Sequence, residues 1–232
     1  MRRLGHTEMK VSRLGIGLFQ IGELAAKEAS MKVDTLLGTA LEQGLNFLDT
    51  AACYGESESY LGSFVSTHRQ AFVLATKCGH LAGELQGQPW SADLVKHSLE
   101  RSLARLQTDH IDLLQIHSCD KATLEKGEII DALMSARDTG KTRFIGYSGD
   151  NEAAKFAVES GVFDTLQTSL NLVDQRALNP LLSLAKDKDM GVIIKRPVAN
   201  MVWGAEGTPV SYTHLRAHET RHDLVCRLRL EK

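Results

Sequence analysis

The chain has 232 residues and a formal net charge of −2, with 43% hydrophobic and 24% charged residues. This length suits one domain with a sizeable core, and the small charge gives no electrostatic reason to expect nucleic acid or an anionic membrane as a partner. No apolar run approaches the roughly 18–20 residues of a membrane span, and the start MRRLGHTEMK is not followed by the apolar stretch of a signal peptide. We therefore expect a cytoplasmic protein with no nucleic-acid or membrane partner.

Short apolar runs recur along the chain in the manner of buried strands. Several of them are continuous rather than alternating, as in strands that are buried on both faces. The runs predicted to be strands are 13–18, 45–49, 72–76, 111–116, 143–147, 164–170 and 191–195.

Amphipathic segments separate these runs. In 27–43 the apolar residues fall on one helical face before Gly44, and in 91–107 Ser91 can cap a helix whose leucines recur at helical spacing. The predicted helices are 27–43, 56–68, 91–107, 126–140, 151–160 and 179–188.

The alternation of strands and helices predicts an α/β fold with a parallel sheet and right-handed crossovers. Seven strands with six intervening helices favour a (β/α)8 TIM barrel over a doubly wound sheet, and no GxGxxG follows the first strand. Closing such a barrel takes an eighth strand and its helices, about 50 further residues, whereas 37 residues follow Lys195. We therefore expect an incomplete barrel that lacks the eighth strand and its helices.

The last residues differ in character from the rest of the chain. From about Val210 they read VSYTHLRAHETRHDLVCRLRLEK, without Gly, Pro or a buried-strand run. This stretch resembles a spurious segment that recurs at the C-terminus of unrelated metagenomic reading frames and is translated from sequencing adaptor. We therefore expect a partial barrel domain at 1–209 and a non-native tail at 210–232.

Metal binding is not predicted. The four cysteines form neither a CxxC pair nor a zinc-finger spacing, so we expect free thiols. In the tail, His214, His218 and His222 would share one face of a helix, a pattern that suits zinc or nickel. Because that segment is judged foreign to the fold, we expect no natural metal site there.

Four polar residues stand at or just after the C-terminal ends of predicted strands. They are Asp49 and Tyr54 in LDTAACYG, Lys77 in VLATKCG and His117 in LLQIHS. Barrels and open α/β sheets place their chemistry at this edge. Taken singly, such residues are more often structural, and it is their joint pattern that indicates a site.

A carboxylate, a phenol, an amine and an imidazole together suit proton donation to a carbonyl oxygen. Reduction by hydride leaves negative charge on that oxygen, so a proton must arrive there as well. Tyr54 can supply it, and a nearby Lys77 ammonium, held by Asp49, would lower the Tyr54 pKa from its usual value of ~10. His117 can hydrogen-bond the same oxygen and orient it.

These motifs resemble those of the aldo-keto reductases, NAD(P)H-dependent carbonyl reductases built on a TIM barrel. The resemblance runs from LGHTEMKVSRLGIGLFQIG (4–22) to about KRPVANMVWG (195–204), and its opening is similar to the family's N-terminal hairpin, which closes the bottom of the barrel. The catalytic tetrad of the family is matched residue for residue by Asp49, Tyr54, Lys77 and His117. The resemblance implies an oxidoreductase that reduces an aldehyde or ketone to an alcohol, with Tyr54 as proton donor.

The resemblance also implies NADPH as the cofactor, with NADH as an alternative. Ser148 and Gln167 match positions at which the family holds the nicotinamide carboxamide. Gly149 stands where an Asn usually follows the serine, and Asp150 or Asn151 is a candidate to replace that Asn.

Two cations follow the seventh predicted strand. Lys195 stands where many members of the family place an aromatic residue under the nicotinamide ring, and Arg196 lies beside it. A cation there can stack on a ring or pair with the pyrophosphate. The family's grip on the 2′-phosphate comes after the eighth strand, so the resemblance gives no preference between NADPH and NADH.

Phe19 in the first βα loop and Trp90 after the third strand are candidates to form an apolar wall beside Tyr54. Trp90 has the alternative role of packing at a helix end. No oligomeric state is predicted. Two alternatives to an active reductase stay open: a regulatory subunit that binds cofactor with little turnover, and a truncated, inactive chain whose apolar strand edges are exposed.

Overall fold

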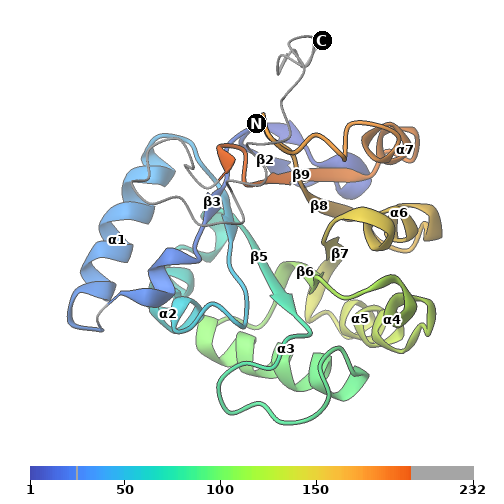
Figure 1. Ribbon diagram of the computed structural model, residues 1–232. Coiled ribbons are helices and arrows are strands. Elements are labelled where there is room, and N and C mark those ends of the chain that lie inside the picture. The colour runs from blue at the N-terminus through green and yellow to red at the C-terminus, as the bar shows by residue number, and fades with distance from the viewer. Residues whose placement is uncertain (25, 200–232) are drawn as a thin grey trace, which may run out of the picture.

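Seven parallel strands form one curled sheet in the computed structural model, which describes residues 1–24 and 26–199, with the backbone alone for 26–30 (Figure 1). Each strand pairs with the next one along the chain, so the order in the sheet is the order in the sequence. The strands are β3 (Ile16–Gly17), β4 (Phe47–Asp49), β5 (Val73–Cys78), β6 (Ile111–His117), β7 (Thr142–Ser148), β8 (Thr165–Ser169) and β9 (Gly191–Lys195).

Helices cover the outside of this sheet, as Figure 1 shows. The α-helices are α1 (Ala26–Glu42), α2 (Ser57–His68), α3 (Ala92–Leu106), α4 (Lys121–Glu125), α5 (Glu128–Asp138), α6 (Asn151–Ser160) and α7 (Leu181–Asp187). Short 3-10 helices are η1 (Gly5–Thr7), η2 (Gln20–Glu23) and η3 (Arg69–Ala71). Parallel pairing with external helices confirms the predicted barrel architecture, with seven of the eight strands of a closed barrel among the described residues.

Local sequence signals explain most element boundaries. The Ser91 hydroxyl accepts a hydrogen bond from the Leu94 N–H at 3.2 Å and starts α3, as its sequence predicts. Gly44, with a φ of 78°, follows the end of α1. The tail expected at 210–232, including His214, His218 and His222, lies outside the described residues.

Two elements differ from the sequence-based prediction. The first strand, expected at 13–18, is only Ile16–Gly17, because only these two residues pair with β4, its one neighbour among the described strands. The helix expected at 126–140 is preceded by a separate short helix, α4. The Asp120 carboxylate starts α4 by accepting a hydrogen bond from the Thr123 N–H at 2.7 Å, and Gly127, with a φ of 81°, separates α4 from α5.

An antiparallel hairpin of β1 (Arg2–Arg3) and β2 (Lys10–Val11) closes the N-terminal end of the sheet. It is anchored to the start of β9 by the His6 N–H, which donates to the Asp189 carbonyl at 2.7 Å. The apolar side chains of the hairpin pack against apolar side chains of β4, β5 and β6. Together they form an inner core that consists of Leu4, Met9, Val11, Phe47, Val73, Ala75 and Leu113. The predicted hairpin is therefore confirmed, and the opposite end of the sheet is left for polar side chains.

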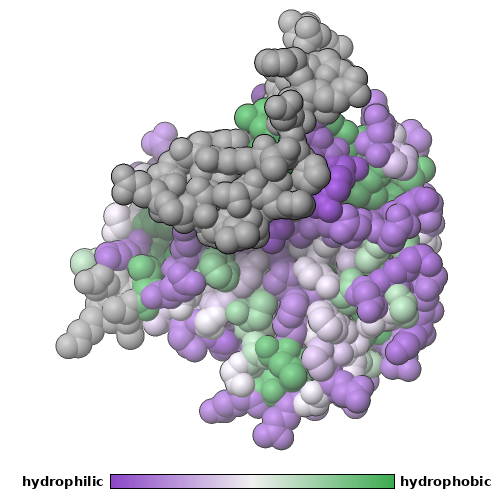
Figure 2. All heavy atoms as spheres, viewed as in Figure 1, coloured by the Kyte–Doolittle hydropathy of each residue, from purple (hydrophilic) through white to green (hydrophobic). Residues whose placement is uncertain are grey.

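A larger core fills the space between the sheet and the helices. Each helix buries one apolar stripe there and turns charged residues outward. Figure 2 accordingly shows mainly hydrophilic residues over the outer helices α4 to α7. Of the helices described, none combines the length and apolar character needed to cross a membrane.

Candidate active site

Lys77 is the centre of a polar cluster at the C-terminal end of the sheet. It comes from β5, its side chain is 2% exposed, and its Nζ lies 2.8 Å from Asp49 Oδ2 at the end of β4. The same ammonium donates to the Thr50 carbonyl at 2.9 Å. A buried ammonium is tolerated only when such partners replace water, so Asp49 and Thr50 fix where the positive charge stands.

Tyr54 presents its hydroxyl to this ammonium. Tyr54 Oη lies 3.5 Å from Lys77 Nζ. The loop after β4 stays attached to β5 because the Ala52 N–H donates to the Lys77 carbonyl at 3.0 Å. Gly22 gives the loop room, since a Cβ there would stand 1.9 Å from the Tyr54 carbonyl oxygen. The loop thus holds the phenol over β5.

The electrostatics of Tyr54 differ from the sequence-based expectation. Burial raises the pKa of the phenol above its usual value, while the Lys77 charge acts in the opposite direction. The expected effect of Lys77 is present, but burial outweighs it in the protein alone. Tyr54 therefore holds its proton at neutral pH.

His117 closes the cluster from the end of β6. Burial and, next, the Lys77 charge lower the pKa of His117 to about 3, so the imidazole is neutral at physiological pH. Its ring centroid lies 5.8 Å from that of Tyr54, and its Nδ1 lies 3.3 Å from Cys53 Sγ. Two side chains near the ring, Cys53 and His80, were not predicted as site residues, and the His80 ring centroid lies 4.6 Å away.

Ser148 and Gln167 join the cluster through Asp49. The Ser148 hydroxyl donates to Gln167 Oε1 at 2.7 Å, and Gln167 Nε2 donates to Asp49 Oδ2 at 2.9 Å. Gln115, which the sequence did not single out, approaches the other carboxylate oxygen, with its Nε2 3.4 Å from Oδ1. The parallel register puts Ser148 beside His117 and Gln167 beside Ser148.

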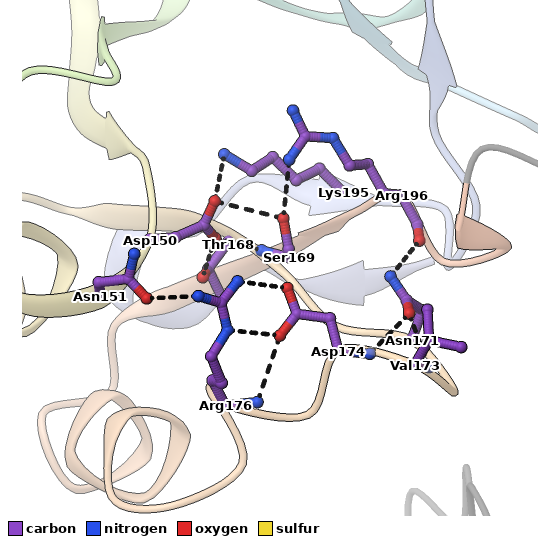
Figure 3. Close-up of polar contacts among 10 residues, drawn as sticks. All are labelled: Asp150, Asn151, Thr168, Ser169, Asn171, Val173, Asp174, Arg176, Lys195 and Arg196. Carbon is purple, nitrogen blue, oxygen red and sulfur yellow. Dashed lines mark hydrogen bonds and ion pairs between the residues drawn. The ribbon is translucent and has the colours of Figure 1, made fainter. Parts of the chain in front are cut away.

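Lys195 and Arg196 lie at the neighbouring end of β9 (Figure 3). Lys195 Nζ points to Asp150 and stands 3.3 Å from its Oδ2, while Arg196 Nη1 donates to the Ser169 hydroxyl at 3.2 Å. Burial lowers the pKa of Lys195 and the Asp150 charge opposes this. Lys195 and Arg196 also lie close enough to His117 to lower its pKa.

Asp150 holds Lys195 in place. Burial alone would raise the pKa of Asp150, but the Ser169 N–H and the Lys195 charge together lower it. Its Oδ1 accepts hydrogen bonds from the Thr168 hydroxyl at 2.9 Å and from the Ser169 N–H at 2.8 Å (Figure 3). The signal in the sequence for this ion pair was an acidic residue two positions after one strand and a lysine at the end of another.

Phe19 and Trp90 both lie beside the polar cluster. The Phe19 ring meets the Tyr54 ring edge to face at 5.0 Å and is 53% exposed. Trp90 donates its indole N–H to the His117 carbonyl at 2.8 Å, and its ring lies 5.1 Å from that of His80. Trp90 therefore stabilises the end of β6 and also borders the site.

The donor set of the cluster suits a nicotinamide cofactor. The hydroxyl of Ser148 and the amide of Gln167 can bind a carboxamide, and the cations of Lys195 and Arg196 can bind phosphates. Among the residues whose side chains the structure describes, 1–24 and 31–199, there is no group of three or more His, Cys, Asp or Glu side chains able to hold a metal ion.

Known proteins share this arrangement of sequence and fold. The family model described as "Aldo/keto reductase family" matches residues 13–221. L-galactose dehydrogenase of Arabidopsis thaliana is 32% identical over 221 residues, which are 90% of this chain and 68% of that protein. An NADH-specific methylglyoxal reductase of Escherichia coli is 28% identical over 216 residues, which are 84% of this chain and 66% of that protein.

Solved structures give the same result. The holo form of an aldo-keto reductase from Bacillus halodurans matches with a TM-score of 0.79 and 26% identity, covering 93% of this chain and 74% of that one. A glycerol dehydrogenase from Gluconobacter oxydans matches with a TM-score of 0.73 and 26% identity, covering 86% and 64%. The chain spans about two thirds of the length of the curated relatives, from 64% to 68% of the first three. On the family model and these likenesses together, the chain belongs to the aldo/keto reductase family.

Proposed function

We propose that this protein reduces the carbonyl group of an aldehyde or ketone to an alcohol, with NADPH or NADH as hydride source and Tyr54 as proton donor. The observation that carries the proposal is the row of Asp49, Lys77 and Tyr54. The Lys77 ammonium stands 2.8 Å from a carboxylate oxygen on one side and 3.5 Å from a phenol oxygen on the other. A phenol beside a buried ammonium is suited to donate a proton to a carbonyl oxygen, because the ammonium stabilises the resulting phenolate.

Lys77 stabilises the charge left behind by the proton. When Tyr54 donates, its oxygen becomes negative a few ångströms from the ammonium, in a site with little water to screen the two charges. Asp49 holds the ammonium in position, and Gln167 and Gln115 hold Asp49. The phenol regains its proton from solvent after the product leaves.

His117 orients the carbonyl. Because its imidazole is neutral, the ring carries one N–H that can donate to the carbonyl oxygen. Phe19 and Trp90 border the same space and supply apolar contact for the rest of the substrate.

The cofactor would be held by residues from three neighbouring strands. Ser148 and Gln167 would bind its carboxamide, and Lys195 and Arg196 would bind its phosphates or contact its ring. When bound, the reduced nicotinamide supplies the hydride that attacks the carbonyl carbon.

Aldehyde-dependent loss of reduced-nicotinamide absorbance tests the proposal. The full 232-residue chain is mixed with NADPH or NADH and with a panel of aldehydes and ketones. We expect consumption that requires a carbonyl compound and saturates with it. Tight cofactor binding without consumption would instead identify a binding subunit, and the absence of both would identify an inactive chain.

A further inference from the structure

Cys53 contacts His117 across the site. Cys53 directly precedes Tyr54 in the loop after β4, and its Sγ lies 3.3 Å from Nδ1 of the His117 ring at the end of β6. β5 lies between these two strands in the sheet. The contact is therefore made over the end of β5, where Lys77 stands.

The direction of this hydrogen bond follows from the charge state of the two groups. Burial raises the pKa of the Cys53 thiol, so the sulfur carries its hydrogen. His117 has a pKa of about 3 and is a neutral imidazole, with a hydrogen on only one of its two nitrogens. A thiol sulfur is a weak acceptor, whereas an unprotonated imidazole nitrogen is a good one. The thiol S–H therefore donates and Nδ1 accepts.

The other neighbours of His117 do not decide its tautomer. Trp90 donates to the backbone carbonyl of His117 and not to the ring. The His80 ring packs at an interplanar angle of 74°. Among the described residues, Cys53 is the hydrogen-bond partner of the His117 ring. The second ring nitrogen, Nε2, has no hydrogen-bond partner among the described residues.

We propose that Cys53 is a positioning residue that fixes the His117 tautomer, donating its S–H to Nδ1 so that the hydrogen stays on Nε2. The catalytic consequence rests on the proposed function, in which Nε2–H donates to the carbonyl oxygen. In the opposite tautomer Nε2 would turn a lone pair toward that oxygen, and the hydrogen bond would be replaced by repulsion. The loss of one such hydrogen bond corresponds to roughly a tenfold decrease in kcat/KM.

Two variants of Cys53 separate the donor from the volume of the side chain. Cys53→Ala and Cys53→Ser leave side chains of similar size, but only serine keeps a donor for Nδ1. Cys119→Ala is the control, because Cys119 is a buried thiol two residues after His117 with no hydrogen bond to its ring. Nitrogen-15 NMR of histidine-labelled protein reports which ring nitrogen carries the hydrogen, and His117→Gln identifies the signals of His117.

We expect wild type to show an unprotonated Nδ1 and a protonated Nε2. Cys53→Ala should give a mixture of the two tautomers and kcat/KM about tenfold lower. Cys53→Ser should restore the tautomer and most of kcat/KM, and Cys119→Ala should resemble wild type in both. A hydrogen on Nδ1 in wild type, or an unchanged tautomer in Cys53→Ala, would overturn the proposal. Because the NMR measurement needs no turnover, an inactive chain would overturn the proposed function without affecting the test of the tautomer.

Discussion

Lys77 carries a positive charge on a side chain that is 2% exposed, and Asp150 and Lys195 form a second ion pair a few strands away. In each pair burial penalises the charged forms, and the partner and nearby hydrogen-bond donors compensate. At the scale of single residues, the charged form of each group in these two ion pairs therefore depends on its partner. Removal of one partner leaves the other charge buried and incompletely compensated.

Lys195→Met tests whether the second ion pair serves the cofactor. We expect the Kd for NADPH to rise about tenfold or more, because a charge-assisted contact contributes roughly 1.5–3 kcal/mol. NADPH fluorescence titration measures it.

Lys155→Met is the matched control, since Lys155 is a half-buried lysine of α6 paired 3.8 Å from Glu159. The Kd of Lys155→Met for NADPH should stay within about twofold of wild type, as expected for loss of a surface ion pair. An equally small change in Lys195→Met would mean that Lys195 has only a structural role.

Sequence patterns were most informative for residues with distinctive chemistry at strand ends. Two signals made it possible to select Asp49, Tyr54, Lys77 and His117. Each lies at or just after the end of a predicted strand, and each matches a family motif. Cys53, His80 and Gln115 could not, because their contacts depend on which strands are neighbours and on side-chain direction. Asp150 was considered for a different role, since only the fold brings it to Lys195.

At the scale of elements, α2, α3 and β5 enclose a buried carboxyl group behind the loop that carries Tyr54. Glu58 of α2 is 1% exposed, and its Oε1 accepts a hydrogen bond from the Thr76 hydroxyl of β5 at 2.7 Å. Its Oε2 has no hydrogen-bond partner among the described residues. Burial raises the pKa of Glu58. The Thr76 hydrogen bond, the nearby Ser102 hydroxyl and the charges of Arg105 and Arg101 only partly oppose this.

Glu58→Gln should therefore stabilise the protein increasingly as the pH rises. A carboxyl group whose pKa is raised by folding favours the native state below its unfolded pKa, and this contribution is lost as the pH rises through the folded pKa. The variant should match wild type near pH 4 and exceed its free energy of unfolding above the folded pKa, by about 1.4 kcal/mol for each unit of pKa shift. Urea unfolding at several pH values measures this difference.

Glu159→Gln provides the comparison, because Glu159 is an exposed residue of α6. Its free energy of unfolding should stay within about 0.5 kcal/mol of wild type at every pH. Destabilisation of Glu58→Gln that grows with pH would show that Glu58 is ionised and compensated by the neighbouring hydroxyls and arginines.

Element boundaries were predicted well where the sequence carries a local signal. Ser91 and Gly44 mark the limits of α3 and α1 correctly. The short helix α4 was missed because five residues are too few to display a helical period. The first strand was predicted too long because its apolar pattern extends beyond the residues that pair with β4.

At the scale of the whole molecule, the two ends of the sheet have different tasks. The hairpin and the inner core fill the N-terminal end, and the polar cluster occupies the C-terminal end. Gly5 is the point at which the hairpin meets β9, because a Cβ there would lie 2.1 Å from the Gly191 nitrogen. The barrel architecture was predictable from the alternation of strands and helices, whereas this close contact between distant segments was not.

Gly5→Ala should destabilise the fold more than a comparable substitution elsewhere. Gly44→Ala is the matched variant, since Gly44 also has a positive φ, and apart from its chain neighbours no atom of the described residues lies within 4 Å of its Cβ position. We expect Gly44→Ala to cost about 1 kcal/mol from backbone strain and Gly5→Ala roughly 1–3 kcal/mol more from the clash. Equal urea midpoints for the two variants would show that the hairpin does not depend on this contact.

The central claim, that the Tyr54 phenol gives its proton to the carbonyl, is tested most directly by turnover in Tyr54→Phe. Tyr60→Phe is the control, because Tyr60 lies on α2 and donates to the Leu24 carbonyl at 3.3 Å, away from Lys77. We predict that Tyr54→Phe lowers kcat for aldehyde reduction by about 10²–10⁴-fold while the Kd for NADPH stays within about twofold, and that Tyr60→Phe keeps both. A kcat in Tyr54→Phe equal to that of wild type would contradict the claim.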